Sequence, residues 1–335
     1  MSDEIIQLSD GRHLLTTWHT YPVAQAEQAT LISLWQSEWT KTDFDWLPAL
    51  NGAYSETLRI DSLVGTIEGV PVATATVLFP GNDPEVSVIS SVITLPAYRR
   101  LGIAAQLTDR AAIRSFSAGC QVCYLGGTSV YCRCGFDWYA GVIMRRAAPQ
   151  AGECESHFFA PGQSTSVREA QWGDLPGTAC LIAQRPDCLV IDYPRGLISG
   201  KYSAELRCVS NFPLLWDDAT NHGGTVCVLA GEAAHRVLGV GTLTPGAGNS
   251  RRHVAVVDLF AHDHYATDAS RILEYLIGQA VKRDVESLQA YVAVDDRNKM
   301  AWFEQARFKP VTTLTGQLRI EDRPIDVKIL QRQTQ

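Results

Sequence analysis

The stretch from Glu85 to Ala104, EVSVISSVITLPAYRRLGIA, restricts the fold of this chain more than any other. Its first part, Val86–Thr94, is a run of β-branched residues broken only by serines, which predicts a buried strand. Pro96 has no N–H to donate and is expected to end the pairing of that strand. Helix-forming residues follow from position 104 onward. The sequence therefore predicts a strand, a basic turn and a helix in succession.

The turn between these elements carries Arg99, Arg100 and Gly102. The first N–H groups of a helix have no partners within the helix, and here they would point outward beside two arginines. Gly102 has no Cβ that could block a ligand. This arrangement predicts an anion site, most naturally for a phosphate or pyrophosphate. The usual nucleotide-binding loops are excluded, because neither GxxxxGK[ST] nor GxGxxG occurs here.

Arg99-x-x-Gly102-x-Ala104 resembles the Q/R-x-x-G-x-G/A pyrophosphate loop of the GNAT acetyltransferase family, in the same place between a strand and a helix. Further on, the segment from Tyr131 to Phe136, YCRCGF, resembles the family's Y-x-x-x-G-F segment. The resemblance implies that Tyr131 is the general acid that protonates the departing thiolate. It also implies a site for acetyl-coenzyme A, or another acyl-coenzyme A, formed by Val92, Ile93, Thr94, Arg99, Arg100, Leu101, Gly102, Ile103 and Ala104.

The composition limits the class of protein. A chain of 335 residues is longer than most single domains, so two domains are expected. A net charge of −7 argues against a nucleic-acid partner and favours a cationic or amine substrate. No apolar run is long enough to span a bilayer, and the acidic start lacks a signal-peptide pattern. We therefore expect a cytoplasmic protein with no membrane partner.

Nine cysteines, an odd number without a secretory signal, argue against a disulfide framework. Cys120, Cys123, Cys132 and Cys134 cluster as C-x2-C-x8-C-x-C, a pattern that could bind zinc. Cys120 and Cys123 lie on a predicted strand, however, where their spacing would place them on opposite faces. We expect buried, reduced thiols and no bound metal.

The order of predicted elements indicates an α/β (α+β) fold with a mixed, mostly antiparallel sheet flanked by helices. A single further strand is expected over residues 136–147. Residues 151–166 are rich in Pro, Gly and Ser and predict a linker, in which residues 157–159 (HFF) would form one short strand.

The second half of the chain repeats this order. VLGVGTLTP and HVAVVDLFA predict strands, SRILEYLIGQAVKRD predicts a helix, and residues 298–308 resemble the family's N-x-x-A-x-x-x-Y-x-x-x-G-F segment. We therefore expect two tandem GNAT-like modules, residues 1–150 and 167–335. The second module is degenerate, because its turn AHDHYATDAS contains neither glycine nor arginine and its Asp263 and Asp268 would repel a pyrophosphate. Phe303 and Arg307 stand at the positions of Tyr131 and Gly135.

The resemblance implies acetyl transfer to a primary amine of a small molecule by direct attack on the thioester. The general base stays open, because the strand over residues 86–94 has no carboxylate; His19, Asp43 and Asp45 are candidates. One alternative is a GNAT-like decarboxylase of malonyl thioesters or a loading enzyme for an acyl carrier protein, which would use Thr94 or His19. Another is a protein that binds acyl-coenzyme A without turnover.

Overall fold

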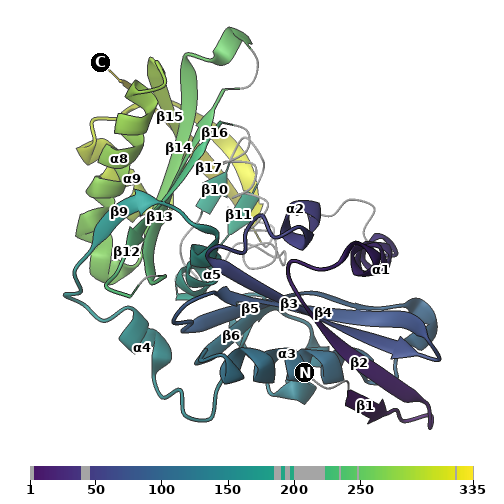
Figure 1. Ribbon diagram of the computed structural model, residues 1–335. Helices are drawn as coiled ribbons and strands as arrows, with labels where there is room; N and C mark the ends of the chain where they lie inside the picture. Colours follow the sequence, from purple (N-terminus) through teal and green to yellow (C-terminus); the bar gives the residue numbers. More distant parts are fainter. Residues whose placement is uncertain are drawn as a thin grey trace. The chain divides into compact units, whose positions relative to one another are not determined.

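A computed structural model of the chain describes residues 4–38, 46–184, 190–192, 197–199, 223–233, 235–246, 249–320 and 323–334. It divides into two compact units, the first ending at Cys154 and the second beginning at Glu155 (Figure 1). Each unit contains one large, mostly antiparallel sheet flanked by helices, which confirms the predicted fold class. None of the helices in the described ranges is long and apolar enough to cross a bilayer.

The first unit is built on a sheet with the strand order β1-β2-β3-β4-β5-β6-β8-β7. Only the pair β5–β6 is parallel; all other neighbours are antiparallel. The strands are β1 (Glu4–Gln7), β2 (His13–Thr20), β3 (Leu58–Ile67), β4 (Val70–Pro80), β5 (Val86–Thr94), β6 (Val122–Gly126), β7 (Asp137–Ala140) and β8 (Ile143–Ala147).

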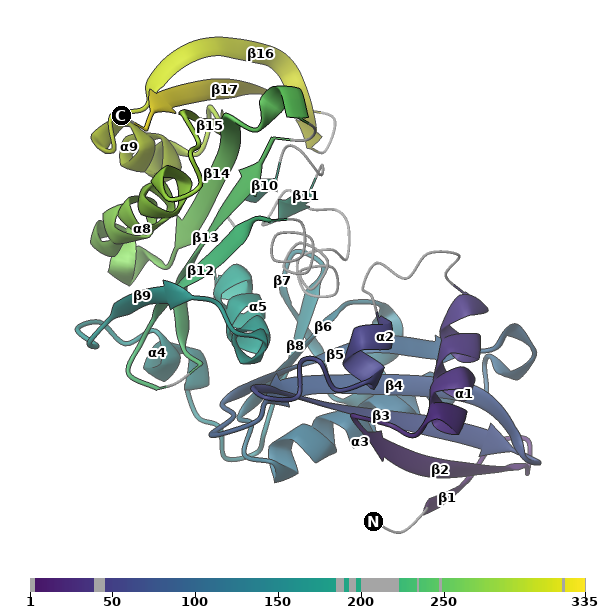
Figure 2. The same cartoon turned by 45° about the horizontal axis from the view of Figure 1, so that its top comes forward.

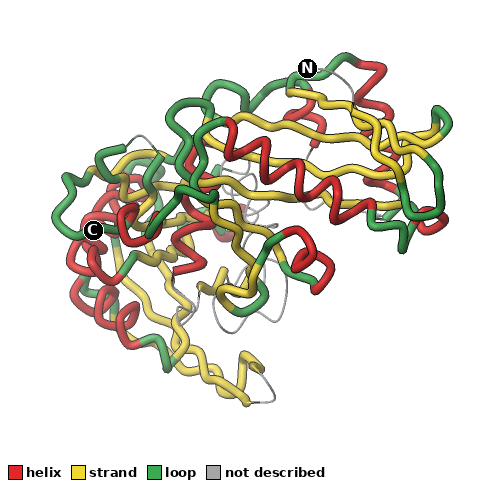
Figure 3. Tube along the Cα trace, turned by 90° about the horizontal axis from the view of Figure 1, so that it is seen from below, coloured by secondary structure: helices red, strands yellow, loops and turns green. Residues whose placement is uncertain are grey.

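Helices cover both faces of this sheet. Helix α3 (Ile103–Ser117) runs across the strands on one face, while α1 (Gln25–Gln36) and α2 (Trp46–Leu50) lie on the other (Figures 2 and 3). The α3 face is a single apolar cluster in which helix residues such as Leu107 pack against Ala75 of β4. Because both faces are covered, β3 and β4 are almost continuously buried, which explains their long apolar runs.

The second unit has a sheet with the order β16-β17-β15-β14-β13-β12-β9, in which only β14–β15 is parallel. Helices α8 (Ala269–Val281) and α9 (Arg297–Gln305) lie side by side on one face (Figure 1). Helix α5 (Leu175–Gln184) packs on β13. The strands are β9 (Ser166–Glu169), β12 (Thr225–Ala230), β13 (Val237–Pro245), β14 (Val254–Ala261), β15 (Ser287–Ala293), β16 (Lys309–Ile320) and β17 (Arg323–Gln333), and β10 (Val190–Asp192) pairs separately with β11 (Leu197–Ser199).

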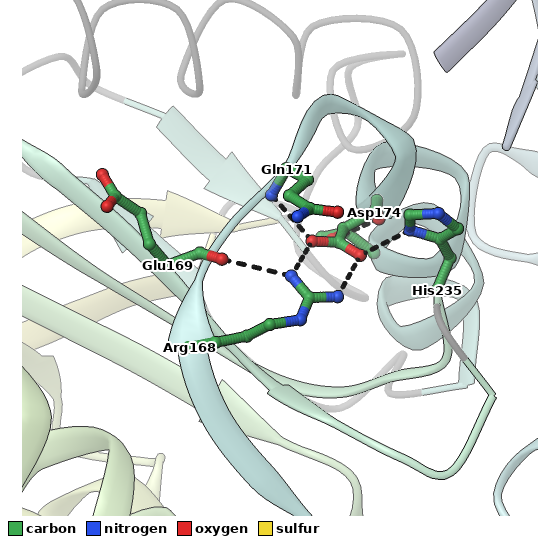
Figure 4. Close-up of polar contacts among 6 residues, drawn as sticks. Arg168, Glu169, Gln171, Asp174 and His235 are labelled. Carbon is green, nitrogen blue, oxygen red and sulfur yellow. Dashed lines mark hydrogen bonds and ion pairs between the residues drawn. The ribbon is translucent and has the colours of Figure 1, made fainter. Parts of the chain in front are cut away.

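The fully buried carboxylate of Asp174 connects the elements at the beginning of the second unit's sheet through hydrogen bonds (Figure 4). It accepts two hydrogen bonds from the Arg168 guanidinium, at 2.6 and 2.8 Å, one from His235 Nδ1 at 2.9 Å and one from the Gln171 amide at 2.8 Å. Burial alone would raise the pKa of this carboxyl, but the bonds from Arg168 and His235 outweigh it and lower the pKa. The cluster ties β9 to the start of α5 and to the loop before β13.

Two local predictions are wrong. Residues 136–147 form two strands, β7 and β8, rather than one, because the chain turns back at Gly141 with a φ of +54°. The HFF segment is not a strand but the end of the short helix α4 (Cys154–Phe158). Phe158 and Phe159 are both buried with ring centroids 4.8 Å apart, whereas consecutive strand residues would point to opposite faces.

Candidate functional site

The candidate site lies where the two parallel strands of the first unit separate. Strand β5 pairs with β6 only from Val86 to Ile89, opposite Val122 to Leu125. Its pairing with β4 continues on the other side to Thr94. Residues 90–94 of β5 therefore have no ladder partner in β6 along one edge, and their backbone groups on that edge can meet a ligand.

A β-bulge shapes β5 at this point. Thr94 stands opposite Ala73 and Ile93 opposite Thr74, but the next pair is Ser90 with Thr76, so Ser91 and Val92 share a single partner residue. Ser91 has a φ of +52°, uncommon for a residue with a side chain. Of the three β5 residues predicted to form part of the acyl-coenzyme A site, Ile93 and Thr94 are in register with β4, whereas Val92 lies in the bulge.

The turn that follows β5 is exposed. After the short 3₁₀ turn η1 (Pro96–Tyr98), Arg100 and Gly102 both have left-handed backbones, with φ of +67° and +80°. Both residues are exposed, and a Cβ added to Gly102 would meet no atom within 4 Å. Gly102 is the N-cap of α3, so the first amides of this helix open onto the same space.

The side chains of the predicted loop have different surroundings. The Arg99 guanidinium turns back to the carbonyl of Thr94, at 3.0 Å, and forms an ion pair with Glu38 just after α1. Ile103 is buried in the core and Leu101 packs against it. Arg100 is exposed, while Ala104 is half-buried. The loop thus combines one anchored arginine, one exposed arginine, and a backbone that the core holds in place.

Tyr131 lies in the 3₁₀ helix η2 (Ser129–Cys134), directly after β6. The Thr128 hydroxyl caps the start of η2, and Gly135 ends it with a φ of +77°. The Tyr131 ring packs edge-on against Phe136, with centroids 6.5 Å apart. Burial raises the pKa of Tyr131 to about 12, and its hydroxyl has no hydrogen-bond partner among the described residues. Such a phenol is protonated at neutral pH and can donate its proton.

A row of polar side chains crosses the face of the sheet opposite α3. In the strand register, His19 stands opposite Ser62, Ser62 opposite Thr76, and Thr76 opposite Ser90. Neighbouring residues such as Leu63 point to the α3 core, so these four share the α1 face. The buried Tyr21 hydroxyl lies 2.9 Å from Ser62 Oγ, which lies 2.7 Å from Thr76 Oγ1. Sequence reasoning missed this row, because it depends on the register of four strands.

The candidate bases differ in what the structure describes. His19 ends the polar row, and its Nδ1 lies 3.3 Å from Glu27 Oε1 of α1. Asp43 and Asp45 lie outside the described residues. Thr94, the other candidate for a thioester-directed group, ends β5, and its hydroxyl is buried without a hydrogen-bond partner in the described part of the chain.

The cysteine cluster differs from its prediction. Cys120 precedes β6 rather than lying on it, and its thiol and that of Cys123 both lie near the Ser87 hydroxyl, so the two are not on opposite faces. Burial raises the pKa of Cys123 to about 12. Within the described ranges, no group of three or more His, Cys, Asp or Glu residues is placed to hold a metal ion.

The second unit repeats the backbone of the site. Strand β14 leaves β15 after Val256 while its pairing with β13 runs on to Ala261. The Phe308 amide bonds to the Phe303 carbonyl at 3.0 Å, as the Phe136 amide does to Tyr131 at 3.2 Å. Arg307 has a φ of +65°, close to that of Gly135. Phe303 and Arg307 therefore occupy the predicted counterpart positions.

A buried ion pair lies where β14 and β15 separate, which corresponds to the candidate site between β5 and β6 in the first unit. Lys299 of α9 is 1% exposed, and its Nζ lies 2.6 Å from Asp258 Oδ1 of β14. Asp258 points away from α8, because its neighbour Leu259 is paired with Gly241, whose Cα faces Ile272 and Leu276 of that helix. Helix α9 lies beside α8 (Figure 2). The Lys299 side chain meets Asp258 two residues beyond Val256, the last residue of β14 that pairs with β15. The pairing of β13 with β14 has no bulge here.

Comparison with known proteins points to one family. Residues 20–136 match the sequence model of the acetyltransferase (GNAT) family. No curated protein matches the chain. Similar solved structures include a ribosomal-protein-alanine N-acetyltransferase from Brucella melitensis (18% identity, 50% of this chain and 99% of that one, TM-score 0.41). Others are a probable acetyltransferase from Staphylococcus epidermidis (13%, 51% and 100%, 0.43) and a putative acetyltransferase from Salmonella typhimurium with its cofactor acetyl-CoA (15%, 51% and 94%, 0.40).

Proposed function

We propose that the first unit binds acetyl-coenzyme A and transfers its acetyl group to a primary amine of a small molecule, and the match of residues 20–136 to the acetyltransferase (GNAT) family model supports this. The observation that carries the proposal is the exposed turn between β5 and α3, at the point where β5 separates from β6. Its helix amides and Arg100 provide the positive potential that a pyrophosphate requires. Arg99 supports the turn rather than the pyrophosphate, because its contacts with Thr94 and Glu38 fix the conformation of the turn.

The β5 edge supports the thioester end of the cofactor. A carbonyl oxygen that gains negative charge during attack is stabilised by fixed backbone donors. The bulge at Ser91 and Val92 takes these residues out of regular pairing with β4, and β6 has already diverged. The amine nitrogen attacks the carbonyl carbon, and the C–S bond of the tetrahedral intermediate then breaks. The leaving thiolate takes a proton from the Tyr131 hydroxyl, which burial keeps protonated.

The attacking amine must lose a proton, and β5 has no carboxylate to accept it. The polar row on the α1 face offers a route from Ser90 through Thr76 and Ser62 toward His19. Each hydroxyl can accept one proton and donate its own, with ordered water bridging the steps that lack a direct hydrogen bond. We propose His19, beside Glu27, as the final acceptor, because a neutral imidazole nitrogen can accept a proton and the Glu27 carboxylate would pair with the resulting charge.

The proposal is tested by thermal denaturation with acetyl-, malonyl- and free coenzyme A, followed by thiol release in the presence of small amines. A ligand that binds only the folded state must raise the melting temperature. We expect stabilisation by acetyl-coenzyme A and amine-dependent release of its thiol. Stabilisation without turnover of any amine would favour a binding protein, and loss of carbon dioxide from the malonyl thioester would favour the decarboxylase alternative. No stabilisation by any of them would contradict the proposal.

A further inference from the structure

The turn of the second unit that corresponds to the exposed turn of the first is covered by the chain itself. This turn comprises residues 262–268, between β14 and α8, and includes the 3₁₀ turn η5 (Asp263–Asp268). The covering segment is residues 159–165, which lead from α4 into β9. Both segments belong to the second unit.

One end of the covering segment is held by aromatic and backbone contacts. The Phe159 ring is 2% exposed and lies flat on the His262 ring, with centroids 4.4 Å apart and planes 6° from parallel. His264 Nδ1 donates to the Phe159 carbonyl at 2.8 Å, and the Tyr265 hydroxyl donates to the Ala160 carbonyl. Three side chains within four residues, those of His262, His264 and Tyr265, thus contact two consecutive residues of the covering segment.

The other end is held by Arg271, in the first turn of α8. Its guanidinium donates to Thr165 Oγ1 at 2.5 Å, to the Thr165 carbonyl at 3.1 Å and to Asp268 Oδ1 at 2.9 Å. Hydrogen bonds from a charged donor are stronger than those between neutral groups. The bond to Asp268 also neutralises the carboxylate at the N-cap of α8. The first arginine after the turn therefore binds the chain rather than an external anion.

In the first unit, none of the residues that the structure describes covers the corresponding turn in this way. There, Arg12 stacks on the Tyr98 ring at 5.2 Å, but Arg100 and Gly102 remain exposed. In the second unit, the His262 side chain accepts the His264 amide at 3.2 Å, so one amide at the start of η5 is satisfied internally. The contrast is therefore between a turn that presents its amides and one that uses its side chains to bind a peptide segment.

We infer that the 262–271 region is a binding site for residues 159–165 of the same chain, which occupy it as an internal ligand. The carbonyls of Phe159, Ala160 and Thr165 serve as the acceptors there. Asp263 and Asp268 add negative charge that disfavours a phosphate. Together with the Lys299–Asp258 pair, the segment leaves no open turn for an acyl-coenzyme A among the residues of the second unit that the structure describes, so we expect the chain to bind one such molecule, in the first unit.

Hydrogen exchange on the full-length chain tests the docking directly. The Phe159 and Ala160 amides already bond to α4, and Pro161 has none. We expect the amides of residues 162–165 to be protected in the wild type. In Arg271→Ala and His264→Ala they should exchange about 10- to 100-fold faster, because each variant removes hydrogen bonds worth about 1–3 kcal/mol. Arg283→Ala and His253→Ala serve as matched controls. The Arg283 side chain donates to the Gly223 carbonyl, away from the covering segment, and His253 is exposed. Wild-type amides that exchange as fast as an unstructured peptide would overturn the inference.

Calorimetric titration with acetyl-coenzyme A tests the consequence. We expect one molecule per wild-type chain and none per Gly102→Glu chain. A second bound molecule, or one retained by Gly102→Glu, would overturn the inference. A wild-type chain that binds none would contradict the proposed function of the first unit, whereas hydrogen exchange would still decide whether residues 159–165 dock on the second. The two proposals can therefore fail separately.

Discussion

The two units differ at the point where their parallel strands separate. In each, one parallel pair of strands separates partway along, after Ile89 in the first unit and after Val256 in the second. The first unit leaves an unpaired strand edge, a bulge and an exposed turn at this point. The second places Lys299 against Asp258 there and covers its turn with residues 159–165. The comparison teaches that the same backbone arrangement can leave a turn open in one unit and be covered by the chain's own residues in the other.

The largest effect should come from breaking the buried Lys299–Asp258 ion pair. Lys299→Met leaves the Asp258 carboxylate buried without its partner, and we expect a loss of about 3–5 kcal/mol in the free energy of unfolding, measured with denaturant. The double variant Lys299→Met/Asp258→Leu should recover much of that loss, because no charge remains buried. Lys282→Met, on an exposed residue, is the control. A single Lys299 variant as stable as the wild type would show that the pair does not hold the second unit together.

Closing the exposed turn of the first unit should abolish ligand binding. Gly102→Glu puts a carboxylate beside the pyrophosphate, and two like charges about 4 Å apart repel by about 4 kcal/mol at an effective dielectric constant of 20. We expect the affinity for acetyl-coenzyme A in a titration to fall at least about hundredfold (about 2.7 kcal/mol). Gly69→Glu is a matched control, because Gly69 has the same φ of +80° and equally open surroundings. Equal losses in both variants would indicate backbone strain rather than an anion site.

Removing the proposed acid should affect turnover and not binding. Tyr131→Phe keeps the ring packing against Phe136 but removes the proton donor. We expect kcat to fall by about tenfold to hundredfold, at or below the low end for general acids, because water can also protonate a thiolate. Since burial raises the pKa of Tyr131 to about 12, the wild-type rate should not decline through ionisation of this phenol between about pH 8 and 10. Tyr275→Phe, in the second unit, is the control; an unchanged kcat for Tyr131→Phe would remove this residue from the mechanism.

The smallest effect concerns acid stability of the second unit. The pKa of Asp174 is lowered on folding, so its contribution to stability is fully present above the unfolded value of 3.8 and is lost as the pH falls through the folded value. We expect Asp174→Asn to be less stable than the wild type at neutral pH and the difference to narrow below about pH 4. Unfolding followed at several pH values measures this. A difference that stays constant down to pH 2 would show that the carboxylate charge is not what stabilises the cluster.

Local features could be predicted from the sequence alone. Strand β5 has the bounds that its β-branched run indicated, and α3 follows the glycine turn, because both depend on neighbouring residues. The counterpart positions of Phe303 and Arg307 also followed from local spacing. By contrast, the Arg99–Glu38 pair joins residues 61 positions apart, and nothing in either segment indicates the other. Long-range pairs of this kind depend on the complete packing of the fold.

The same limit explains what was missed in the second unit. The sequence showed that residues 261–270 contain neither glycine nor arginine, but not which residues cover that turn. Lys299 belongs to a segment that reads as an ordinary helix start, and Asp258 interrupts an apolar strand without indicating a partner. Their pairing becomes evident only once α9 and β14 are placed together. Likewise, residues 159–165 read as a linker by composition, because the acceptors they offer are backbone carbonyls, which every sequence has.

The Lys299–Asp258 pair also bears on how the concentration of a ligand would change the stability of the second unit. A protein that binds its ligand only when folded is stabilised in proportion to the logarithm of ligand concentration, by about 2.7 kcal/mol at a hundredfold excess over Kd. A unit whose turn is covered by its own residues gains no stability from added ligand. If the first unit binds acetyl-coenzyme A as proposed, its resistance to heat or proteolysis should vary with the level of that ligand, whereas the resistance of the second unit should stay constant. One chain would then contain both a sensor of cofactor supply and an internal reference for it.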